Sequence, residues 1–140
     1  HRSFSFQEFS QRYAQVVNTP SLPNFRRQDT SNRQNSINDL NEYTQQEFQI
    51  RTQDLFDQSL ALYNEMLSAG VAKECARDVL PLSTPTKLYM NGTLRSWLHY
   101  TALRCANGTQ YEHQLIATGV KQLLIEQFPL VSEAMWPVEK

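Results

Sequence analysis

Residues 38–69, NDLNEYTQQEFQIRTQDLFDQSLALYNEMLSA, are the main indicator of the fold because no Pro or Gly interrupts them. Its apolar side chains recur at steps of four, three and four residues, which is the spacing of one helical face. These side chains are Phe56, Leu60, Tyr63 and Leu67. We predict a long central helix here, ended by Gly70 as a cap. Its first half is rich in Gln and acidic groups, so that half is expected to be exposed or covered by another subunit. A shorter helix over residues 72–79 should stop at Pro81.

Two Asn-Gly-Thr triplets, at residues 91–93 and 107–109, mark the start of two more helices. Each triplet is interpreted as a turn whose Thr caps the following helix, because a hydroxyl there can accept a free backbone amide. Thr109 and Glu112 also have the spacing of a capping box. The expected helices are LRSWLHYTALRC and QYEHQLIATGVKQLLIEQF. The apolar stripe of the second is expected to be Ile116, Val120, Leu123 and Leu124.

Extended segments are a minor part of the sequence. Residues 3–17 are typical of an extended segment that turns into a helix, with Ser5 and Glu8 at capping-box spacing. Residues 18–37 are rich in Pro, Asn and Ser, which predicts a long surface loop with a short strand. Residues 86–90 have the content of another short strand. Strand pairing is not expected to be completed within this chain, so we predict an α+β, helix-dominated fold with an incomplete sheet.

Size and charge limit the classes of protein. The chain has 140 residues and a mass of 16.3 kDa, which predicts a single domain over residues 1–140, or part of one. Its 13 Lys and Arg against 14 Asp and Glu exclude the uniformly basic surface of a general nucleic-acid binder. No apolar run is long enough to cross a bilayer and no signal peptide is recognisable, so we expect a soluble, cytoplasmic protein with no membrane partner. The chain begins with His1 and not Met, which favours a fragment.

Side-chain composition favours anion recognition over metal or dinucleotide binding. Arg outnumbers Lys by nine to four, and a planar guanidinium suits phosphate and carboxylate oxygens. Four glycines are too few for a Walker loop or a GxGxxG fingerprint. Cys75 and Cys105 lie in expected helices and are interpreted as buried thiols. The cysteines and His1, His99 and His113 show no ligand spacing, so no metal site is expected.

The opening stretch HRSFSFQEFSQRY, residues 1–13, brings cations, a carboxylate and a hydroxyl close together in sequence. Glu8 and Arg12 are four residues apart, so one interpretation is a surface ion pair on a helix. Ser10 has no base at a spacing that would activate it, so a hydrogen-bonding hydroxyl is favoured over a nucleophile.

Cationic side chains recur in two later segments. Arg77, beside Asp78, is interpreted from its spacing as a helix-end charge. Arg95 and His99 share a helical face, whereas Arg104 is rotated away from them, so the three could serve two ligands or two subunits. On an apolar helix a buried cation needs a partner or an anion. For His99, a hydrogen-bonded core histidine is the alternative.

These segments together resemble the flavin-dependent thymidylate synthases (ThyX). The family signature is Arg-His-Arg, seven residues and Ser, and here His1, Arg2, SFSFQEF and Ser10 reproduce it except for the first Arg. The continuation QRY is similar to the family's Ser-x-Arg-Tyr. ARDVLPL, residues 76–82, and TLRSWLHYTALR, residues 93–104, are similar to two further blocks of the family in the same order.

The resemblance implies an enzyme that methylates dUMP to dTMP, with methylenetetrahydrofolate as carbon donor, FAD as redox carrier and NADPH as hydride source. It also implies a homotetramer with active sites where subunits meet, and N-terminal strands that this chain lacks. The residues implied to bind dUMP are Glu8, Ser10, Gln11, Arg12, Arg77 and Arg104. Arg104 is also implied to be catalytic, beside the pyrimidine. The residues implied to bind FAD are His1, Arg2, Glu8, Thr93, Leu94, Arg95 and His99.

Departures from the family pattern keep other hypotheses open. His99 stands where many members have Asn, and CANGTQYEH, residues 105–113, replaces an acidic stretch, so the flavin side matches less well than the dUMP side. Whether this stretch is active alone is left open. A hypothesis from another class is a non-catalytic helical oligomerisation or nucleotide-binding module. A third is an RNA-binding loop on Arg26, Arg27 and Arg33, against which the near-neutral charge argues.

Overall fold

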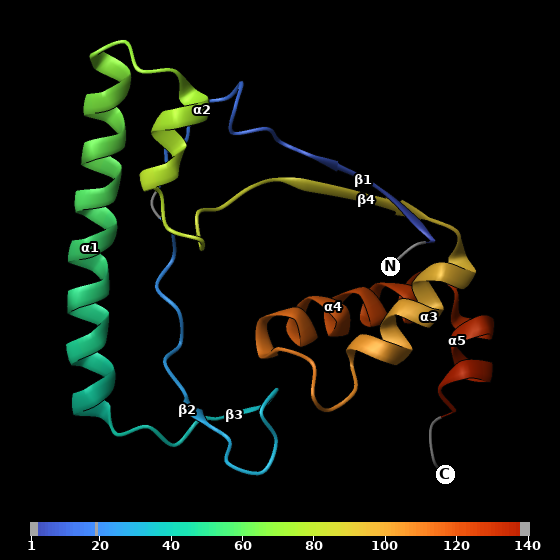
Figure 1. Ribbon diagram of the computed structural model, residues 1–140. Coiled ribbons are helices and arrows are strands. Elements are labelled where there is room, and N and C mark those ends of the chain that lie inside the picture. Colours follow the sequence, from blue (N-terminus) through green and yellow to red (C-terminus); the bar gives the residue numbers. More distant parts are fainter. Residues whose placement is uncertain (1–2, 19, 138–140) are drawn as a thin grey trace. The chain divides into compact units, whose positions relative to one another are not determined.

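The computed structural model of the chain describes residues 3–18 and 20–137 (Figure 1). Its helices are α1 (Glu42–Ser68), α2 (Lys73–Ala76), α3 (Leu94–Arg104), α4 (Tyr111–Gln127) and α5 (Pro129–Met135), with a 3₁₀ turn η1 (Arg77–Val79) after α2. Its strands are β1 (Phe4–Glu8), β2 (Arg27–Gln28), β3 (Ser36–Ile37) and β4 (Leu88–Gly92). The predicted α+β, helix-dominated class is confirmed, and the predicted helix over residues 72–79 is present as α2 followed by η1.

The described residues form two compact units. The α1–α2 unit contains residues 6–18, 20–27 and 38–90. The α3–α5 unit contains residues 3–5, 28–37 and 91–137. Each unit has its own set of buried side chains.

Helix α1 begins later than predicted because Asn41 caps it. The Oδ1 atom of Asn41 accepts a hydrogen bond from the amide of Thr44 at 2.8 Å. At the other end Ala69 is the cap residue, and Gly70 follows with a φ of +85°, which a residue without Cβ adopts without strain. The predicted helix is therefore confirmed, with a later start and with Gly70 one position beyond the cap.

A small apolar cluster on the predicted face of α1 holds the α1–α2 unit together. Tyr63 is fully buried and forms this cluster with Val16 and with Ala76 of α2. Leu60 and Leu67 are half-buried against it. Full burial of a large apolar side chain contributes about 1.5–3 kcal/mol, so this cluster is a main source of stability in the unit. The helical face predicted from sequence spacing is confirmed.

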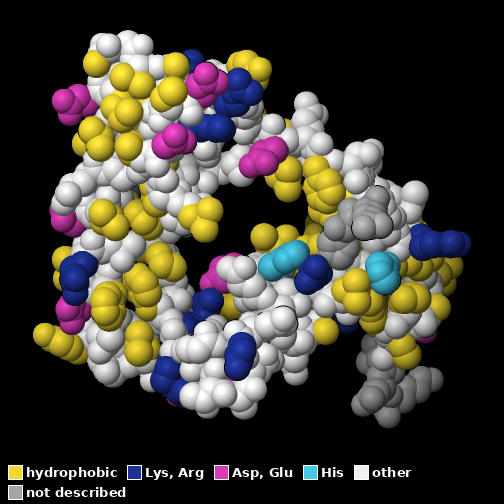
Figure 2. Space-filling view, in the orientation of Figure 1, with side chains coloured by type: hydrophobic (Ala, Val, Ile, Leu, Met, Phe, Trp, Pro, Cys, Tyr) yellow, Lys and Arg dark blue, Asp and Glu magenta, His cyan; other side chains and the backbone are white. Residues whose placement is uncertain are grey.

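The N-terminal half of α1 is largely exposed, as its polar composition predicts. Even its apolar side chains reach the surface, since Tyr43 is 78% and Ile50 is 72% exposed. Figure 2 shows hydrophobic side chains at the surface along this helix, on the left of the view. Coverage of this half by another subunit stays a prediction.

The opening segment forms strand β1 and does not turn into a helix. The capping box predicted at Ser5 and Glu8 is wrong, because both residues lie within the strand. Phe4 and Phe6 alternate with polar residues, which is the period of a strand. Backbone pairing with β4 therefore outweighs the local capping signal.

Strands β1 and β4 pair in an antiparallel, two-stranded sheet. The amide of Phe9 donates to the carbonyl of Lys87 at 2.9 Å, and Gly92, at the other end of β4, lies against the ring of Phe4. A Cβ on Gly92 would come within 2.5 Å of that ring, so the absence of a side chain permits the close approach. The expectation that strand pairing is not completed within this chain is wrong for β1 and β4, which pair with each other.

Aromatic rings pack the interior of the α3–α5 unit. The ring of Phe4 stands edge-on to Trp97 with centroids 4.8 Å apart, and Trp97 stands edge-on to Tyr100 at 5.6 Å. Tyr100 in turn contacts His113 of α4, with ring centroids 5.6 Å apart. Helix α5 is not among the predicted helices. It is tied to α4 by the buried hydroxyl of Ser132, which donates to a carbonyl of α4 at 3.0 Å.

One of the two predicted Thr caps is present. Thr93 caps α3, and its Oγ1 accepts a hydrogen bond from the amide of Ser96 at 3.3 Å. The cap predicted at Thr109 is wrong, since the cap residue of α4 is Gln110 and no side chain accepts a hydrogen bond there. The turn containing Gly108, with a φ of +91°, places Thr109 one residue too early to cap the helix.

The apolar stripe predicted on α4 is partly wrong. Leu124 is buried and Val120 is half-buried, but Ile116 is 63% and Leu123 is 59% exposed. Ala117 is fully buried in their place. The face of α4 that packs within the unit is therefore centred on small Ala117 and on Leu124.

Two further expectations concern the surface. Both cysteines are free thiols, and Cys105 is half-buried, but the prediction of a buried thiol is wrong for Cys75, which the short helix α2 exposes.

Across the described ranges 3–18 and 20–137, no helix combines the length and apolar character needed to cross a bilayer.

Candidate functional site

A tight turn after β1 carries Ser10, Gln11 and Arg12. The carbonyl of Ser10 accepts hydrogen bonds from the amides of Tyr13 and Ala14 at 3.1 and 3.0 Å. Ser10 Oγ accepts a hydrogen bond from the amide of Arg12 at 3.3 Å. The Ser10 hydroxyl thus binds a backbone amide of the turn and stabilises it, so the predicted hydrogen-bonding role of Ser10 is confirmed.

Glu74 of α2, and not Glu8, is the ion-pair partner of Arg12. Arg12 Nη2 lies 2.8 Å from Glu74 Oε2. The predicted pair of Glu8 with Arg12 is wrong because Glu8 ends a strand and Arg12 lies in a turn, so the two share no helical face. Both side chains of the observed pair are about half exposed, so the pair contributes about 0–1 kcal/mol to stability. Its main effect is to orient the guanidinium.

Arg77 lies on the same short helical segment as Glu74. Its Nε donates to the carbonyl oxygen of Glu74 at 3.3 Å, in agreement with a helix-end charge. Within the part of the chain that the structure describes, Nη1 and Nη2 of Arg77 make no hydrogen bond. These donors can therefore bind an anion without losing a contact.

Two cavities of the α1–α2 unit share Gln11 in their walls. The smaller, of about 270 Å³, is lined by Arg77, Asp78 and Thr84 among others. The larger, of about 430 Å³, has Lys87 in a mostly apolar wall and falls in the size range of small-ligand sites. Gln11 and Arg77, which are distant in sequence, thus face one space.

The core of the α1–α2 unit holds the segment that follows the turn. The amide of Val16 donates to the hydroxyl of Tyr63 at 3.2 Å, and both residues are buried. Gln15 Nε2 also donates to Asn64 Oδ1 at 3.3 Å. Lys73 Nζ donates to the carbonyl of Tyr13, in the turn, at 3.0 Å. The placement of the turn therefore depends on α1 and α2 together.

The first turns of α3 present two cationic or ionisable side chains to solvent. Arg95 and His99 are four residues apart and both exposed, whereas Leu94 is half-buried. Ser96 Oγ donates to the carbonyl of Ser3 at 3.4 Å, which ties α3 to the start of β1. The alternative of a core histidine is wrong for His99, because its side chain is exposed.

Arg104 ends α3 one turn after the buried Tyr100, which meets the half-buried His113 of α4. Tyr100 Oη and His113 Nε2 are 3.0 Å apart, and Tyr100 is 3% exposed. Burial lowers the pKa of His113, and the charge of Arg104 lowers it further. Burial raises the pKa of Tyr100, an effect that the charge of Arg104 opposes and Cys105 increases. Both members of the pair are therefore neutral near pH 7.

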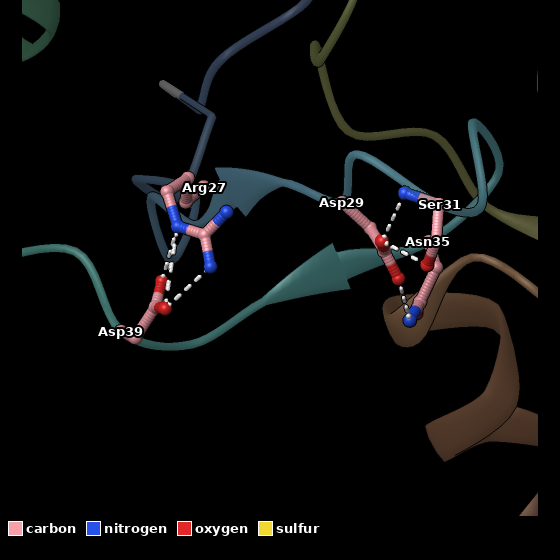
Figure 3. A network of polar contacts seen from close by, with 5 residues as sticks. All are labelled: Arg27, Asp29, Ser31, Asn35 and Asp39. Atoms are coloured by element: carbon pink, nitrogen blue, oxygen red, sulfur yellow. Dashed lines mark hydrogen bonds and ion pairs between the residues drawn. The ribbon is translucent and has the colours of Figure 1, made fainter.

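Two carboxylates organise the chain around β2 and β3 (Figure 3). Asp29 Oδ1 accepts hydrogen bonds from the amide and hydroxyl of Ser31 at 2.8 and 2.7 Å, and Oδ2 accepts one from Asn35 at 3.0 Å. These bonds hold the pKa of Asp29 well below its usual range. Asp39 binds Arg27, with Arg27 Nη2 2.6 Å from Asp39 Oδ2, and this bond lowers the pKa of Asp39. The cation that the RNA-binding hypothesis needs at Arg27 is thus paired internally.

A comparison with protein families shows which family the chain belongs to. Residues 1–130 match the family described as thymidylate synthase complementing protein. The chain belongs to this family. The resemblance seen in the sequence is thereby confirmed.

Relatives of this thymidylate synthase complementing family member are longer than the chain. It is 51% identical over 135 residues to a probable flavin-dependent thymidylate synthase of Paramecium bursaria Chlorella virus 1. It is 47% identical over 135 residues to a flavin-dependent thymidylate synthase of Synechocystis sp. (strain ATCC 27184 / PCC 6803 / Kazusa). Each match covers 96% of this chain and 62% of the relative, so the chain spans about three fifths of their length.

A solved structure shares the fold. The UMP/dUMP methylase PolB from Streptomyces cacaoi, bound with 5-Br UMP, superposes with a TM-score of 0.83 at 23% sequence identity. The match covers 96% of this chain and 63% of PolB. At this level of identity the likeness shows a common fold.

The structure gathers part of the residue set expected in the thymidylate synthase complementing family. In the α1–α2 unit, Arg12 and Arg77 both bond to Glu74, and Gln11 lines a cavity together with Arg77. Ser10 lies in the same turn, and Glu8 is exposed at the end of β1. Arg104 and the expected FAD residues Thr93, Leu94, Arg95 and His99 lie in the α3–α5 unit. His1 and Arg2 lie outside the described residues.

Sequence reasoning missed three residues near these groups. Glu74 orients Arg12, and Tyr100 and His113 form a hydrogen-bonded pair close enough to Arg104 for its charge to affect their pKa values. Glu74 and Arg12 are 62 residues apart, so no local spacing could signal their contact. Residues 3–18 and 20–137 contain no group of three or more His, Cys, Asp or Glu able to hold a metal, so His113 takes no part in such a group.

Proposed function

We propose that residues 1–140 form the C-terminal portion of a flavin-dependent thymidylate synthase. The enzyme methylates dUMP at C5 to give dTMP, with carbon from methylenetetrahydrofolate and hydride from NADPH by way of FAD. Family membership supports the proposal, as do two relatives named as flavin-dependent thymidylate synthases. The PolB neighbour, a UMP/dUMP methylase, supports the class of substrate.

The observation that carries the proposal is a cluster in which Arg12 and Arg77 both bond to Glu74, while Gln11, the neighbour of Arg12, lines a cavity with Arg77. Guanidinium groups bind phosphate oxygens through paired, charge-assisted hydrogen bonds. Glu74 engages Arg12 through Nη2 and Arg77 through Nε only, so each guanidinium keeps an edge for another acceptor. We assign this cluster, with Ser10 and Glu8, to the nucleotide's phosphate and sugar.

Arg104 is assigned to the pyrimidine. A cation beside the N3 and carbonyl groups of uracil favours the ionised ring, which makes C5 more nucleophilic. Because this electrostatic effect requires no covalent protein nucleophile, it agrees with a Ser10 hydroxyl that is held in a backbone turn.

The residues present fit a flavin phosphate. Arg95 and His99 offer exposed nitrogen donors on one face of α3, whose cap is Thr93 and whose first residue is Leu94. Together with His1, Arg2 and Glu8, they are proposed to hold FAD. When bound, the flavin supplies the hydride chemistry, and the protein orients it.

The proposed assembly is a homotetramer whose active sites form where subunits meet. Exposed apolar side chains on α4 support a covered face, with Ile116 63% and Leu123 59% exposed. Light scattering on the complete enzyme tests the assembly, and a monomeric mass would contradict it.

The decisive experiment measures tritium release from C5-labelled dUMP by the complete enzyme. Arg104→Ala should abolish release while the flavin absorbance is kept, and Arg77→Ala should weaken dUMP binding about 10- to 100-fold, the effect of one lost charge-assisted hydrogen bond. Arg51→Ala is the matched control, because Arg51 lies on α1 with 68% of its side chain exposed. It should bind dUMP within about twofold of wild type.

Three results would count against the assignments. Loss of flavin in Arg104→Ala would move Arg104 to the cofactor. Equal dUMP affinity in Arg77→Ala and Arg51→Ala would remove the phosphate site. Binding of dUMP and flavin by the wild-type enzyme without tritium release would favour the non-catalytic nucleotide-binding module.

A further inference from the structure

The junction of α3 and α4 contains a polar pair that the proposed reaction does not use. Tyr100 Oη and His113 Nε2 are 3.0 Å apart, and their rings are tilted by 38° with centroids 5.6 Å apart. Tyr100 is 3% exposed and Phe4 and Trp97 pack edge-on against its ring. A buried hydroxyl of this kind needs a hydrogen-bond partner, and His113 provides it.

The pair lies beside Arg104. Tyr100 and Arg104 are four residues apart on α3, so their side chains occupy neighbouring places on one helical face. His113 comes from the first turns of α4, which packs along α3. Arg104 is half-buried, and a long side chain at such a junction takes its direction from the groups along its stem.

We propose that Tyr100 and His113 are positioning residues for Arg104, which hold its guanidinium in the direction that meets the pyrimidine of dUMP. The inference rests on the proposed function, in which Arg104 contacts the nucleotide. Removing the Tyr100 hydroxyl leaves His113 without its partner at the junction and frees Arg104 to turn.

The charges around the pair make the pKa of His113 a measurable test of the inference. Arg104 and the thiol of Cys105 adjoin it from α3, Glu112 precedes His113 on α4, and the ring of Phe4 adds no charge. The charge of Arg104 helps to lower the pKa of His113. A bound nucleotide that engages Arg104 offsets part of this charge, so the pKa of His113 should rise on binding. By linkage, dUMP should bind more tightly as the pH falls through the pKa of His113.

The test follows the imidazole of His113 by NMR in the complete enzyme, with and without saturating dUMP. His113→Gln identifies the resonance, and it also corrects the pH dependence of binding for the phosphate of dUMP, which itself titrates near pH 6. The expected result is a rise of about half a pKa unit on binding. If wild-type enzyme binds dUMP and the pKa of His113 does not move, the inference is overturned while the proposed function stands.

Variants test the positioning role separately. Tyr100→Phe keeps the ring and should weaken dUMP binding at pH 8 by about two- to tenfold, the effect of one lost hydrogen bond. His113→Gln can still bond the hydroxyl and should bind dUMP within about twofold of wild type, whereas His113→Leu should resemble Tyr100→Phe. Wild-type affinity in Tyr100→Phe would overturn the inference. Failure of the wild-type enzyme to bind dUMP would overturn both the inference and the proposed function.

Discussion

The hydroxyl of Tyr63 should stabilise the α1–α2 unit through a single hydrogen bond. Tyr63 is fully buried, and its hydroxyl accepts the amide of Val16 at 3.2 Å. Tyr63→Phe removes one oxygen and keeps the ring, so the packing against Ala76 is retained. The change therefore isolates the hydrogen bond.

The magnitude follows from the burial of the group left behind. Val16 is 8% exposed, so its amide has little access to water once the hydroxyl is gone. An unsatisfied buried donor costs about 1–3 kcal/mol, whereas a cavity left by removing the whole aromatic side chain costs about 3–5 kcal/mol. We expect Tyr63→Phe to lower the free energy of unfolding by about 1–2 kcal/mol.

Urea unfolding of the variant measures this change directly, and amide exchange of Val16 reports whether the loss is local. Tyr43→Phe is the control, because Tyr43 is on the same helix and 78% exposed. Its free energy of unfolding should change by less than about 0.5 kcal/mol. Equal midpoints for Tyr63→Phe and Tyr43→Phe would refute the reasoning. So would unchanged exchange of the Val16 amide.

Two further predictions concern local hydrogen bonds. Thr93→Ala removes the cap of α3 and should lower the free energy of unfolding, measured by thermal unfolding, by about 0.5–2 kcal/mol. Thr93→Ser keeps the hydroxyl and should retain most of the wild-type stability. Equal stability of the two variants would contradict the capping role. Asp29 has a depressed pKa in the folded chain, so its contribution is present above the usual carboxyl pKa and is lost as the pH falls towards the folded-state value. The protection factor of the Ser31 amide, which is the intrinsic exchange rate divided by the observed rate at the same pH, should therefore fall on acidification in wild type and be low at every pH in Asp29→Ala. Equal protection factors in both proteins at pH 6 would contradict this role of Asp29.

The sequence predicted those parts of the fold that depend on neighbouring residues. The buried face of α1 follows from side chains three and four residues apart, and the cap at Thr93 follows from a hydroxyl and an amide within one turn. The same local logic failed at Ser5 and Glu8, where a capping-box spacing lies in a strand. There the backbone finds its hydrogen bonds on β4, and no local pattern reveals that partner.

The candidate site was likewise predictable from the sequence only in part. Three ordered sequence blocks indicated the family, and the excess of Arg over Lys predicted anion recognition. The pairing of Arg12 with Glu74 and the contact of Tyr100 with His113 are seen only in the folded chain. The physical reason is that residue type and short-range spacing are local properties, whereas a contact across 62 residues depends on how the helices and strands pack.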